Sequence, residues 1–278
     1  MVRVTFWGVR GSIPTPGPDT AGIGGNTSCV EIVAGDDRLI FDGGTGLRLL
    51  GQSLVRQRPL TVHLFFSHVH WDHIQGFPFF APAFVPGNTI HMYGAPNVTG
   101  TVETALAGQM ETPNFPVHLS QLPACLQFHD LHPGQVVELP GGARVVSTAG
   151  VHPGGVLAFR VEYGGRSVVY ATDTEQGIEP DPAMLSLARG ADVLIFDTMY
   201  TPEEYAGAVD GLSKAGWGHS HFEAGAALAR AANVGQYVLF HHDPSQSDAA
   251  VREKEARTRA LFASSVAAAE GMTIDLSR

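Results

Sequence analysis

The feature that most constrains this chain is the segment SHVHWDH at residues 67–73. It directly follows a short apolar run that is typical of a buried strand. In extended backbone, side chains at positions i, i+2 and i+4 point the same way, so we expect His68, His70 and Asp72 to converge. The turn that follows brings His73 round to join them. Because zinc and similar ions bind imidazole nitrogen and carboxylate oxygen, the spacing predicts a metal site.

The remainder of the chain predicts a layered fold with both helices and sheets. Strand-like runs lie at Val2–Trp7, Ser28–Ala34, Arg38–Asp42, Thr61–Phe66, Thr89–Tyr93, Ala143–Ala149, Val156–Tyr163, Ser167–Ala171, Val193–Asp197, Tyr237–Phe240 and Met272–Leu276. Helical patterns lie at Leu47–Arg56, Val98–Met110, Pro182–Ala188, Phe222–Ala232 and Asp248–Ala269. Ser220 and Glu223 predict a capping box at the start of the fourth helix. This order favours an α+β fold in which two mixed β-sheets stack, flanked by helices. Composition does not shift along the chain, so we expect a single domain over residues 1–278.

The charge balance disfavours some functions. The chain has 17 Lys and Arg residues against 27 Asp and Glu residues, which gives a formal charge of −10. Non-specific binding to nucleic acid or to anionic membranes needs a surplus of basic residues, so we expect neither partner. No apolar stretch reaches the roughly 18 residues of a membrane helix, and the N-terminus lacks the apolar run of a signal peptide. With only two distant cysteines, Cys29 and Cys125, we expect reduced and largely buried thiols in a cytoplasmic protein.

Three later segments complete the pattern that begins at residue 67. They are GVHP around His152, ATDT around Asp173 and FHHDP around His241. Together with HxHxDH, and in this order, they resemble the metallo-β-lactamase-fold hydrolases over nearly the whole chain. Within that superfamily the sequence is most similar to the phosphodiesterase branch, which includes tRNA 3′-processing endonucleases and cyclic-phosphate phosphodiesterases. The resemblance implies a four-layer αββα fold and a metal-dependent hydrolase.

The resemblance also implies which residues hold two divalent metal ions. Three histidines hold the first ion in this family, an aspartate and two histidines hold the second, and a further aspartate bridges both. In this chain the corresponding positions are His68, His70 and His152, then Asp72, His73 and His241, with Asp173 as the bridge. Neighbouring strand residues point to opposite faces, so one of His241 and His242 enters the site, and the motif favours His241. Zinc suits this ligand set, and manganese or iron fits it too.

Two catalytic roles follow from the resemblance. Two ions roughly 3.5–4 Å apart can share a hydroxide that attacks phosphorus. Asp72 would bind the second ion with one oxygen and orient that hydroxide with the other. The segment GWGHS at residues 216–220 resembles a short histidine motif of the phosphodiesterase members. It implies that His219 protonates the leaving oxygen or steadies the charge of the phosphate, beside a helix start that favours an anion.

Five further residues have open roles. Ser12, Asn26 and Thr27 lie in a glycine-rich N-terminal segment that also looks like this branch, and they either contact the site or only shape the loop. Arg10 is the nearest cation to a bound phosphate, although a surface salt bridge is the favoured interpretation. Glu175 either supports a metal-bound histidine or caps a turn.

The expected substrate is a small phosphodiester, such as a cyclic nucleotide or another cyclic phosphate. A tRNA-processing role is disfavoured because the chain has no long basic insertion and a formal charge of −10. Two alternatives stay open: a thioester or lactone hydrolase of the same fold, and a non-catalytic metal-binding sensor or scaffold. The apolar run Phe77–Phe84 is expected mainly in the core. A contribution of its rings to the pocket, or to a homodimer interface, stays open.

Overall fold

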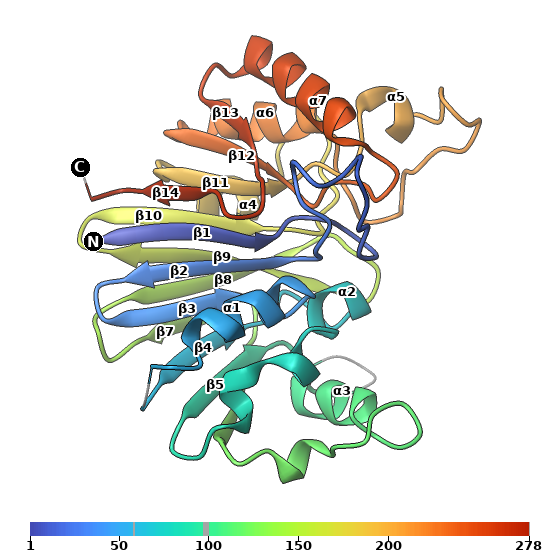
Figure 1. The fold of residues 1–278 in the computed structure, drawn as a ribbon. Coiled ribbons are helices and arrows are strands. Elements are labelled where there is room, and N and C mark those ends of the chain that lie inside the picture. The colour runs from blue at the N-terminus through green and yellow to red at the C-terminus, as the bar shows by residue number, and fades with distance from the viewer. Residues whose placement is uncertain (58, 97–99, 278) are drawn as a thin grey trace.

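The computed structural model describes residues 1–57, 59–96 and 100–277, and over these residues it contains two β-sheets of seven strands each (Figure 1). The first sheet has the order β14-β1-β2-β3-β4-β5-β6. Its strands are β1 (Val2–Gly8), β2 (Cys29–Ala34), β3 (Asp37–Phe41), β4 (Thr61–Phe65), β5 (Thr89–Gly94), β6 (Cys125–Asp130) and β14 (Thr273–Asp275). The second sheet has the order β13-β12-β11-β10-β9-β8-β7. Its strands are β7 (Val136–Glu138), β8 (Arg144–Gly150), β9 (Val156–Tyr163), β10 (Arg166–Ala171), β11 (Val193–Asp197), β12 (Gln236–Phe240) and β13 (Ser265–Ala267).

Both sheets are mixed. Strands β3 to β6 pair in parallel in the first sheet, and strands β10 to β13 pair in parallel in the second. The other pairs are antiparallel. The parallel strands of each sheet therefore end together at one edge, and residues that follow different strands become neighbours there.

Aromatic side chains fill the space between the two sheets. The ring of Phe41 on β3 lies 5.4 Å from Phe65 on β4, and 5.5 Å and 5.4 Å from Phe159 and Tyr170 on the opposite sheet. Strand β11 is buried at all five positions, which explains why its sequence is apolar almost throughout rather than alternating. This packing fixes the two sheets face to face.

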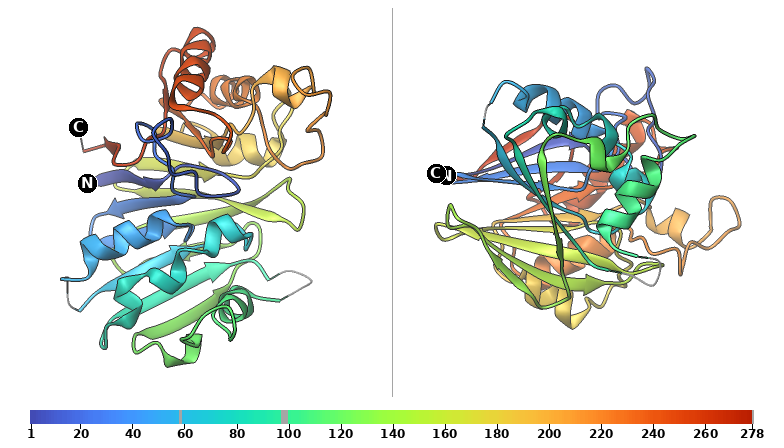
Figure 2. Two further views of the ribbon diagram at one scale, coloured as in Figure 1. Left: turned by 45° about the vertical axis from the view of Figure 1, so that its right-hand side comes forward. Right: turned by 90° about the horizontal axis from the view of Figure 1, so that it is seen from below.

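Helices cover the outer faces of both sheets (Figure 2). The helices are α1 (Gly46–Leu54), α2 (Trp71–Ile74), α3 (Val102–Gln109), α4 (Pro182–Ala188), α5 (Pro202–Tyr205), α6 (Phe222–Ala231) and α7 (Asp248–Leu261), with short 3₁₀ turns at Phe77–Phe79, Ala81–Phe84 and Leu119–Gln121. Helix α3 packs on β5 and β6 of the first sheet, whereas α4 and α6 pack on the second. The predicted four-layer α+β fold is confirmed.

The predicted helix over residues 248–269 is too long. Helix α7 ends at Leu261, because Phe262 takes extended backbone angles and β13 then pairs in parallel with β12. The three-residue strand β13 was not predicted, because the alanine-rich sequence around it favours a helix by propensity. Tertiary pairing decides its structure instead.

The start of one further helix and the N-cap of another differ from expectation. Helix α6 begins at Phe222 as predicted, but its N-cap is His221, so the capping box predicted at Ser220 does not form. The side chain of Ser220 instead donates a hydrogen bond to the carbonyl of Thr174. The helix predicted over residues 98–110 begins at Val102, and its predicted start at residues 98–99 falls outside the described residues.

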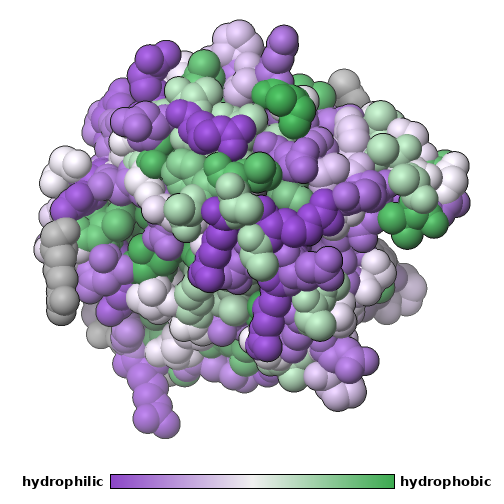
Figure 3. Space-filling model, turned by 90° about the horizontal axis from the view of Figure 1, so that it is seen from above, coloured by the Kyte–Doolittle hydropathy of each residue, from purple (hydrophilic) through white to green (hydrophobic). Residues whose placement is uncertain are grey.

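The surface over α7 is mostly hydrophilic, with apolar side chains scattered among polar ones (Figure 3). Within the described ranges, no helix has the length and apolar character needed to cross a bilayer. Cys29 is buried and Cys125 is exposed, and both are free thiols. The expectation of two buried thiols is therefore wrong for Cys125, which begins the edge strand β6.

A buried histidine on β4 predicts acid sensitivity. The side chain of His63 contacts the hydroxyl of Tyr93 and stacks on His91, and His63 is only 4% exposed. Burial, and next the neighbouring His91, lower the pKa of His63 to about 4. A histidine in the unfolded chain has a pKa of about 6.5, so the unfolded state takes up its proton first as the pH falls. His63 thus stabilises the fold fully above about pH 6.5 and loses this contribution as the pH falls toward 4.

Between pH 7 and pH 5 the contribution of His63 to the free energy of unfolding should fall by on the order of 1–2 kcal/mol. Urea unfolding at the two pH values measures it. The fall in the free energy of unfolding between the two pH values should be smaller in His63→Gln by the contribution of His63. The control His118→Gln, at an exposed site, should show the same fall as the wild type. Equal losses in the wild type and His63→Gln would contradict the assignment.

Candidate metal centre

The predicted site residues gather where parallel strands of both sheets end. Asp173 follows β10 and His241 follows β12, and the segment 68–73 follows β4. His152 comes from the loop between β8 and β9. Asp173 and His241 have positive φ angles of 50° and 58°, so the backbone turns sharply as each strand ends. These turns aim both side chains at residues 68–73 across the gap between the sheets.

Three of the histidines form the outer part of the cluster. Ligand atoms of His68, His70 and His152 lie within 4.8 Å of one another, and Nε2 of His152 is 3.1 Å from Nδ1 of His70. The carbonyl of Gly218 lies 2.9 Å from Nδ1 of His152 and accepts its hydrogen bond, so Nε2 is the nitrogen left to face the cluster. Burial, and next the charge of His73, lower the pKa of His68 well below its usual range. His68 is thus held neutral, the form that binds a metal.

Two aspartates and two histidines form the inner part. Oδ2 of Asp72 lies 3.1 Å from Nε2 of His73 and 3.3 Å from Nε2 of His241. Oδ2 of Asp173 lies 3.3 Å and 3.2 Å from the same two nitrogens. Burial alone would raise the pKa of Asp72, but His73 and His241 lower it well below its ordinary value. This group therefore offers ionised carboxylates beside imidazole nitrogens.

Asp173 belongs to the inner group and also faces the outer group. Its Oδ1 is 3.9 Å from Nε2 of His68, while its Oδ2 faces His73 and His241. Nε2 of His68 and Nε2 of His73 are buried and have no hydrogen-bond partner. Buried polar atoms without partners are costly, and a divalent cation would satisfy both. The residues present therefore fit the metal ions that the sequence predicts.

Asp42, which sequence reasoning missed, supports this cluster from behind. Its Oδ2 lies 2.8 Å from Nδ1 of His73 and accepts a hydrogen bond from Tyr170, while its Oδ1 accepts one from the backbone N–H of Ser67. The contact with His73 directs Nε2 of that ring toward the cluster. The sequence offered one indication of this role: Asp42 is the last residue of a predicted strand, and the structure shows that this strand runs parallel to β4.

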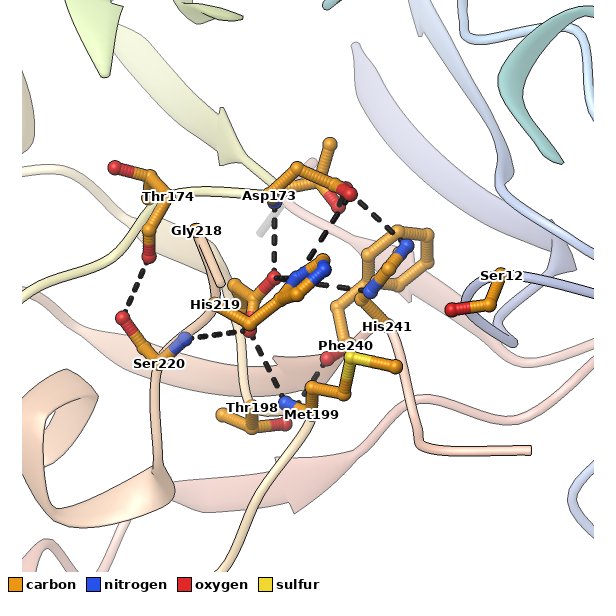
Figure 4. Close-up of polar contacts among 12 residues, drawn as sticks. Ser12, Asp173, Thr174, Thr198, Met199, Gly218, His219, Ser220, Phe240 and His241 are labelled. Carbon is orange, nitrogen blue, oxygen red and sulfur yellow. Dashed lines mark hydrogen bonds and ion pairs between the residues drawn. The ribbon is translucent and has the colours of Figure 1, made fainter. Parts of the chain in front are cut away.

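Asp197 supports His219 in the same way, and Figure 4 shows His219 lying among Asp173, Ser220 and His241. Oδ2 of Asp197 lies 2.9 Å from Nδ1 of His219, and Oδ1 accepts a hydrogen bond from the backbone N–H of Ser220. The ring of His219 stacks on His241 with centroids 5.1 Å apart. Burial opposes the charged form of His219, but Asp197 and then Asp173 raise its pKa to about 9. The sequence predicted His219 but not its partner Asp197, which ends β11.

The structure separates the two adjacent histidines after β12. His241 contacts Asp72 and Asp173, whereas His242 is fully buried and donates from Nε2 to the carbonyl of Ala268, 3.0 Å away. The side chain of His242 thus points away from the cluster.

Arg10 has a different role from the favoured surface salt bridge. It is fully buried and donates hydrogen bonds to the carbonyls of Gly24, Asp243 and Gln246, so that interpretation is wrong. Nε and Nη1 of Arg10 make these bonds and join the N-terminal segment to the loop after β12, while Nη2 has no hydrogen-bond partner and lies 3.8 Å from Oδ1 of Asp248. These contacts give Arg10 a structural role in holding the two segments together.

The other residues with open roles lie near the cluster without joining it. Asn26 donates to Glu270, and Thr27 bonds to the backbone of Thr45, so both shape the loop. The backbone N–H of Ser12 donates to Oδ2 of Asp72 at 2.8 Å, and this contact steadies that carboxylate.

Glu175 fixes the loop that precedes His219. It accepts hydrogen bonds from the backbone N–H groups of Gly216 and Gly218. Because the carbonyl of Gly218 in turn holds His152, Glu175 acts on two site residues through this loop. A Cβ on Gly218 would lie 2.3 Å from Nδ1 of His152, which explains the glycine.

The fold and the cluster together define a metal-dependent hydrolase. The chain belongs to the beta-lactamase superfamily, whose sequence pattern, described as the beta-lactamase superfamily domain, matches residues 37–242. The membership that the four sequence motifs predicted is confirmed.

Several known proteins are similar to this chain in sequence or in fold. Ribonuclease Z from Thermoplasma acidophilum is 25% identical over 307 residues, which covers 92% of this chain and 91% of that protein. Ribonuclease Z from Myxococcus xanthus is 29% identical over 217 residues, which covers 75% of this chain and 64% of that protein. The crystal structure of a diphosphatase from the PhnP family superposes with a TM-score of 0.71 at 18% identity, covering 100% of this chain and 98% of that one. The last similarity concerns the fold alone.

Proposed function

We propose that this protein hydrolyses a small phosphodiester, such as a cyclic nucleotide or another cyclic phosphate, at a centre of two zinc ions. The observation that carries the proposal is the placement of Asp173 between two groups of imidazoles, with one carboxylate oxygen toward each. The proposed ligands are the seven predicted ones: His68, His70 and His152, then Asp72, His73 and His241, with Asp173 shared. Two such ions, when bound, polarise the phosphate and provide a nucleophile from water at neutral pH.

The chain's own residues supply the remaining steps. Asp72, steadied by the backbone N–H of Ser12, accepts a hydrogen bond from the attacking water and so orients it. His219, held by Asp197, donates the proton that the leaving oxygen needs when its bond to phosphorus breaks. The raised pKa of His219, about 9, keeps this proton available at neutral pH.

Phosphodiesters are favoured over thioesters and lactones by two observations. The relatives from Thermoplasma and Myxococcus are named ribonuclease Z, and RNA is a phosphodiester. His219 adds a proton donor beside the cluster. A small substrate is favoured over RNA by the formal charge of −10, which opposes the approach of a polyanion. Cleavage of RNA near a 3′ end is the second candidate, because of the names of those relatives.

Turnover of bis(p-nitrophenyl) phosphate by protein loaded with zinc or manganese tests the proposal. We expect metal-dependent turnover that disappears in His68→Ala and persists in His118→Ala, which changes an exposed histidine outside the cluster. Cyclic nucleotides, a tRNA precursor and a thioester are then compared. Specific cleavage of the tRNA precursor would favour the second candidate. Two bound ions without turnover of any phosphodiester would contradict the proposal.

A further inference from the structure

A cavity of about 420 Å³ opens directly beside His219. Its wall comes largely from the segment between β11 and α6, which includes α5 and projects from the body of the molecule (Figure 1). Tyr200, Glu204, Asp210 and Trp217 lie on this wall, and Ser12 and Asp243 close the other side. Nothing in the proposed chemistry at the metal centre uses these side chains, although the cavity shares His219 with it.

Trp217 presents an aromatic surface to the cavity. It is 48% exposed, although large apolar rings are usually buried. The ammonium group of Lys214 lies 4.9 Å from the centre of its ring and is itself held by Asp210 at 2.5 Å. The ring of Trp217 thus contacts a paired cation, while about half of the surface of its side chain stays open. A half-exposed tryptophan in the same cavity as His219 is a platform on which a flat ring can stack.

The platform has a fixed position relative to the metal centre. The residues on either side of Trp217 donate their backbone N–H groups to Glu175. The next residue, Gly218, holds His152, and His219 follows it. Because Trp217 and His219 line the same cavity, one substrate molecule can place a phosphate at the cluster and a second group on Trp217.

The charges of the cavity indicate what kind of group enters. Away from His219, the lining residues that the structure describes include three acidic side chains, Glu204, Asp210 and Asp243, and one lysine, Lys214, which is already paired with Asp210. A chain of phosphates would be repelled here, whereas an uncharged aromatic ring would not.

We propose that the cavity between Tyr200, Trp217 and His219 binds a nucleobase of the substrate, stacked on Trp217. This inference rests on the proposed function in one respect, the placement of the phosphate at the metal centre. It narrows the substrate class from phosphodiesters in general to those of nucleosides.

Calorimetric titration of zinc-loaded protein with adenosine 5′-monophosphate and with ribose 5-phosphate tests the inference. The two probes share sugar and phosphate and differ by the base. Since base–aromatic stacking changes affinity by roughly 5- to 150-fold, we expect the nucleotide to bind at least about fivefold more tightly. Trp217→Ala should bring the ratio of the two affinities close to one without lowering the affinity for ribose 5-phosphate. Trp217→Phe should restore most of this ratio. The matched control Phe79→Ala, which removes an aromatic ring that is 59% exposed outside the cavity, should leave the ratio unchanged.

Equal affinities of the two probes for the wild type would overturn the inference, as would a ratio that Trp217→Ala does not change. Binding is measured without turnover, so the result stands apart from the test of the proposed function. If bis(p-nitrophenyl) phosphate is not hydrolysed while the base still adds affinity through Trp217, the cavity is correct and the hydrolytic proposal fails. If hydrolysis occurs and the base adds no affinity, the hydrolytic proposal stands and the inference about the cavity fails.

Discussion

Replacing His219 with alanine should leave the metal content unchanged and lower kcat by roughly 10²–10⁴-fold, the usual contribution of a general acid. The reason is geometric, because His219 stands beside the cluster with its Nδ1 on Asp197 and is absent from the proposed set of metal ligands. KM should change much less than kcat, since the proton moves only as the leaving bond breaks. Steady-state kinetics and metal analysis on the same samples measure both quantities.

The choice of leaving group makes this prediction sharper. A p-nitrophenolate leaves readily without a proton, whereas an alkoxide does not. The loss in His219→Ala should therefore be larger for a cyclic nucleotide than for bis(p-nitrophenyl) phosphate. Asp197→Asn should reproduce part of the loss, because it removes the charge that holds the proton on His219. Loss of metal from His219→Ala, or equal losses for both leaving groups, would contradict a general-acid role.

Local spacing was enough to predict the first part of the site. The residues of the HxHxDH segment are close in the chain, so the geometry of an extended segment followed by a turn brings their side chains together. His152, Asp173 and His241 are far apart in sequence and depend on which strands become neighbours. Their placement was predicted through the resemblance of four motifs in a fixed order, and the structure brings all three to the segment at residues 68–73.

Residues whose roles depend on tertiary neighbours could not be predicted. Asp42 and Asp197 end strands in the sequence, and nothing local distinguishes them from carboxylates that cap a turn. Asp42 acquires its role because the segment after the parallel strand β4 places His73 2.8 Å away, and Asp197 acquires its role because the loop before α6 returns His219 to within 2.9 Å. Arg10 was misjudged for the same reason, since the carbonyls that bury it come from the other end of the chain. Propensity failed at β13, where pairing with β12 outweighs an alanine-rich sequence.

Replacing Asp173 with asparagine should have the largest effect on the metal centre. Asparagine keeps the size of the side chain and tolerates the positive φ of 50° at this position, so the fold should persist. It removes the negative charge between the two groups of imidazoles and leaves a single amide oxygen, which cannot serve both sides equally. We expect no more than one tightly bound ion per chain and a fall in turnover beyond the roughly 10–100-fold typical of changes in outer-shell partners.

Metal content and zinc-dependent thermal stability separate this effect from misfolding. Since a ligand that binds only the folded state raises its stability, zinc should raise the Tm of the wild type more than that of Asp173→Asn. The control Asp197→Asn alters a carboxylate of the same cluster that bonds to the backbone N–H of Asp173 but is not among the proposed metal ligands. It should retain both ions. Two tightly bound ions in Asp173→Asn would show that the carboxylate is not shared, and the cluster would then have to bind each ion through its own histidines and Asp72 alone.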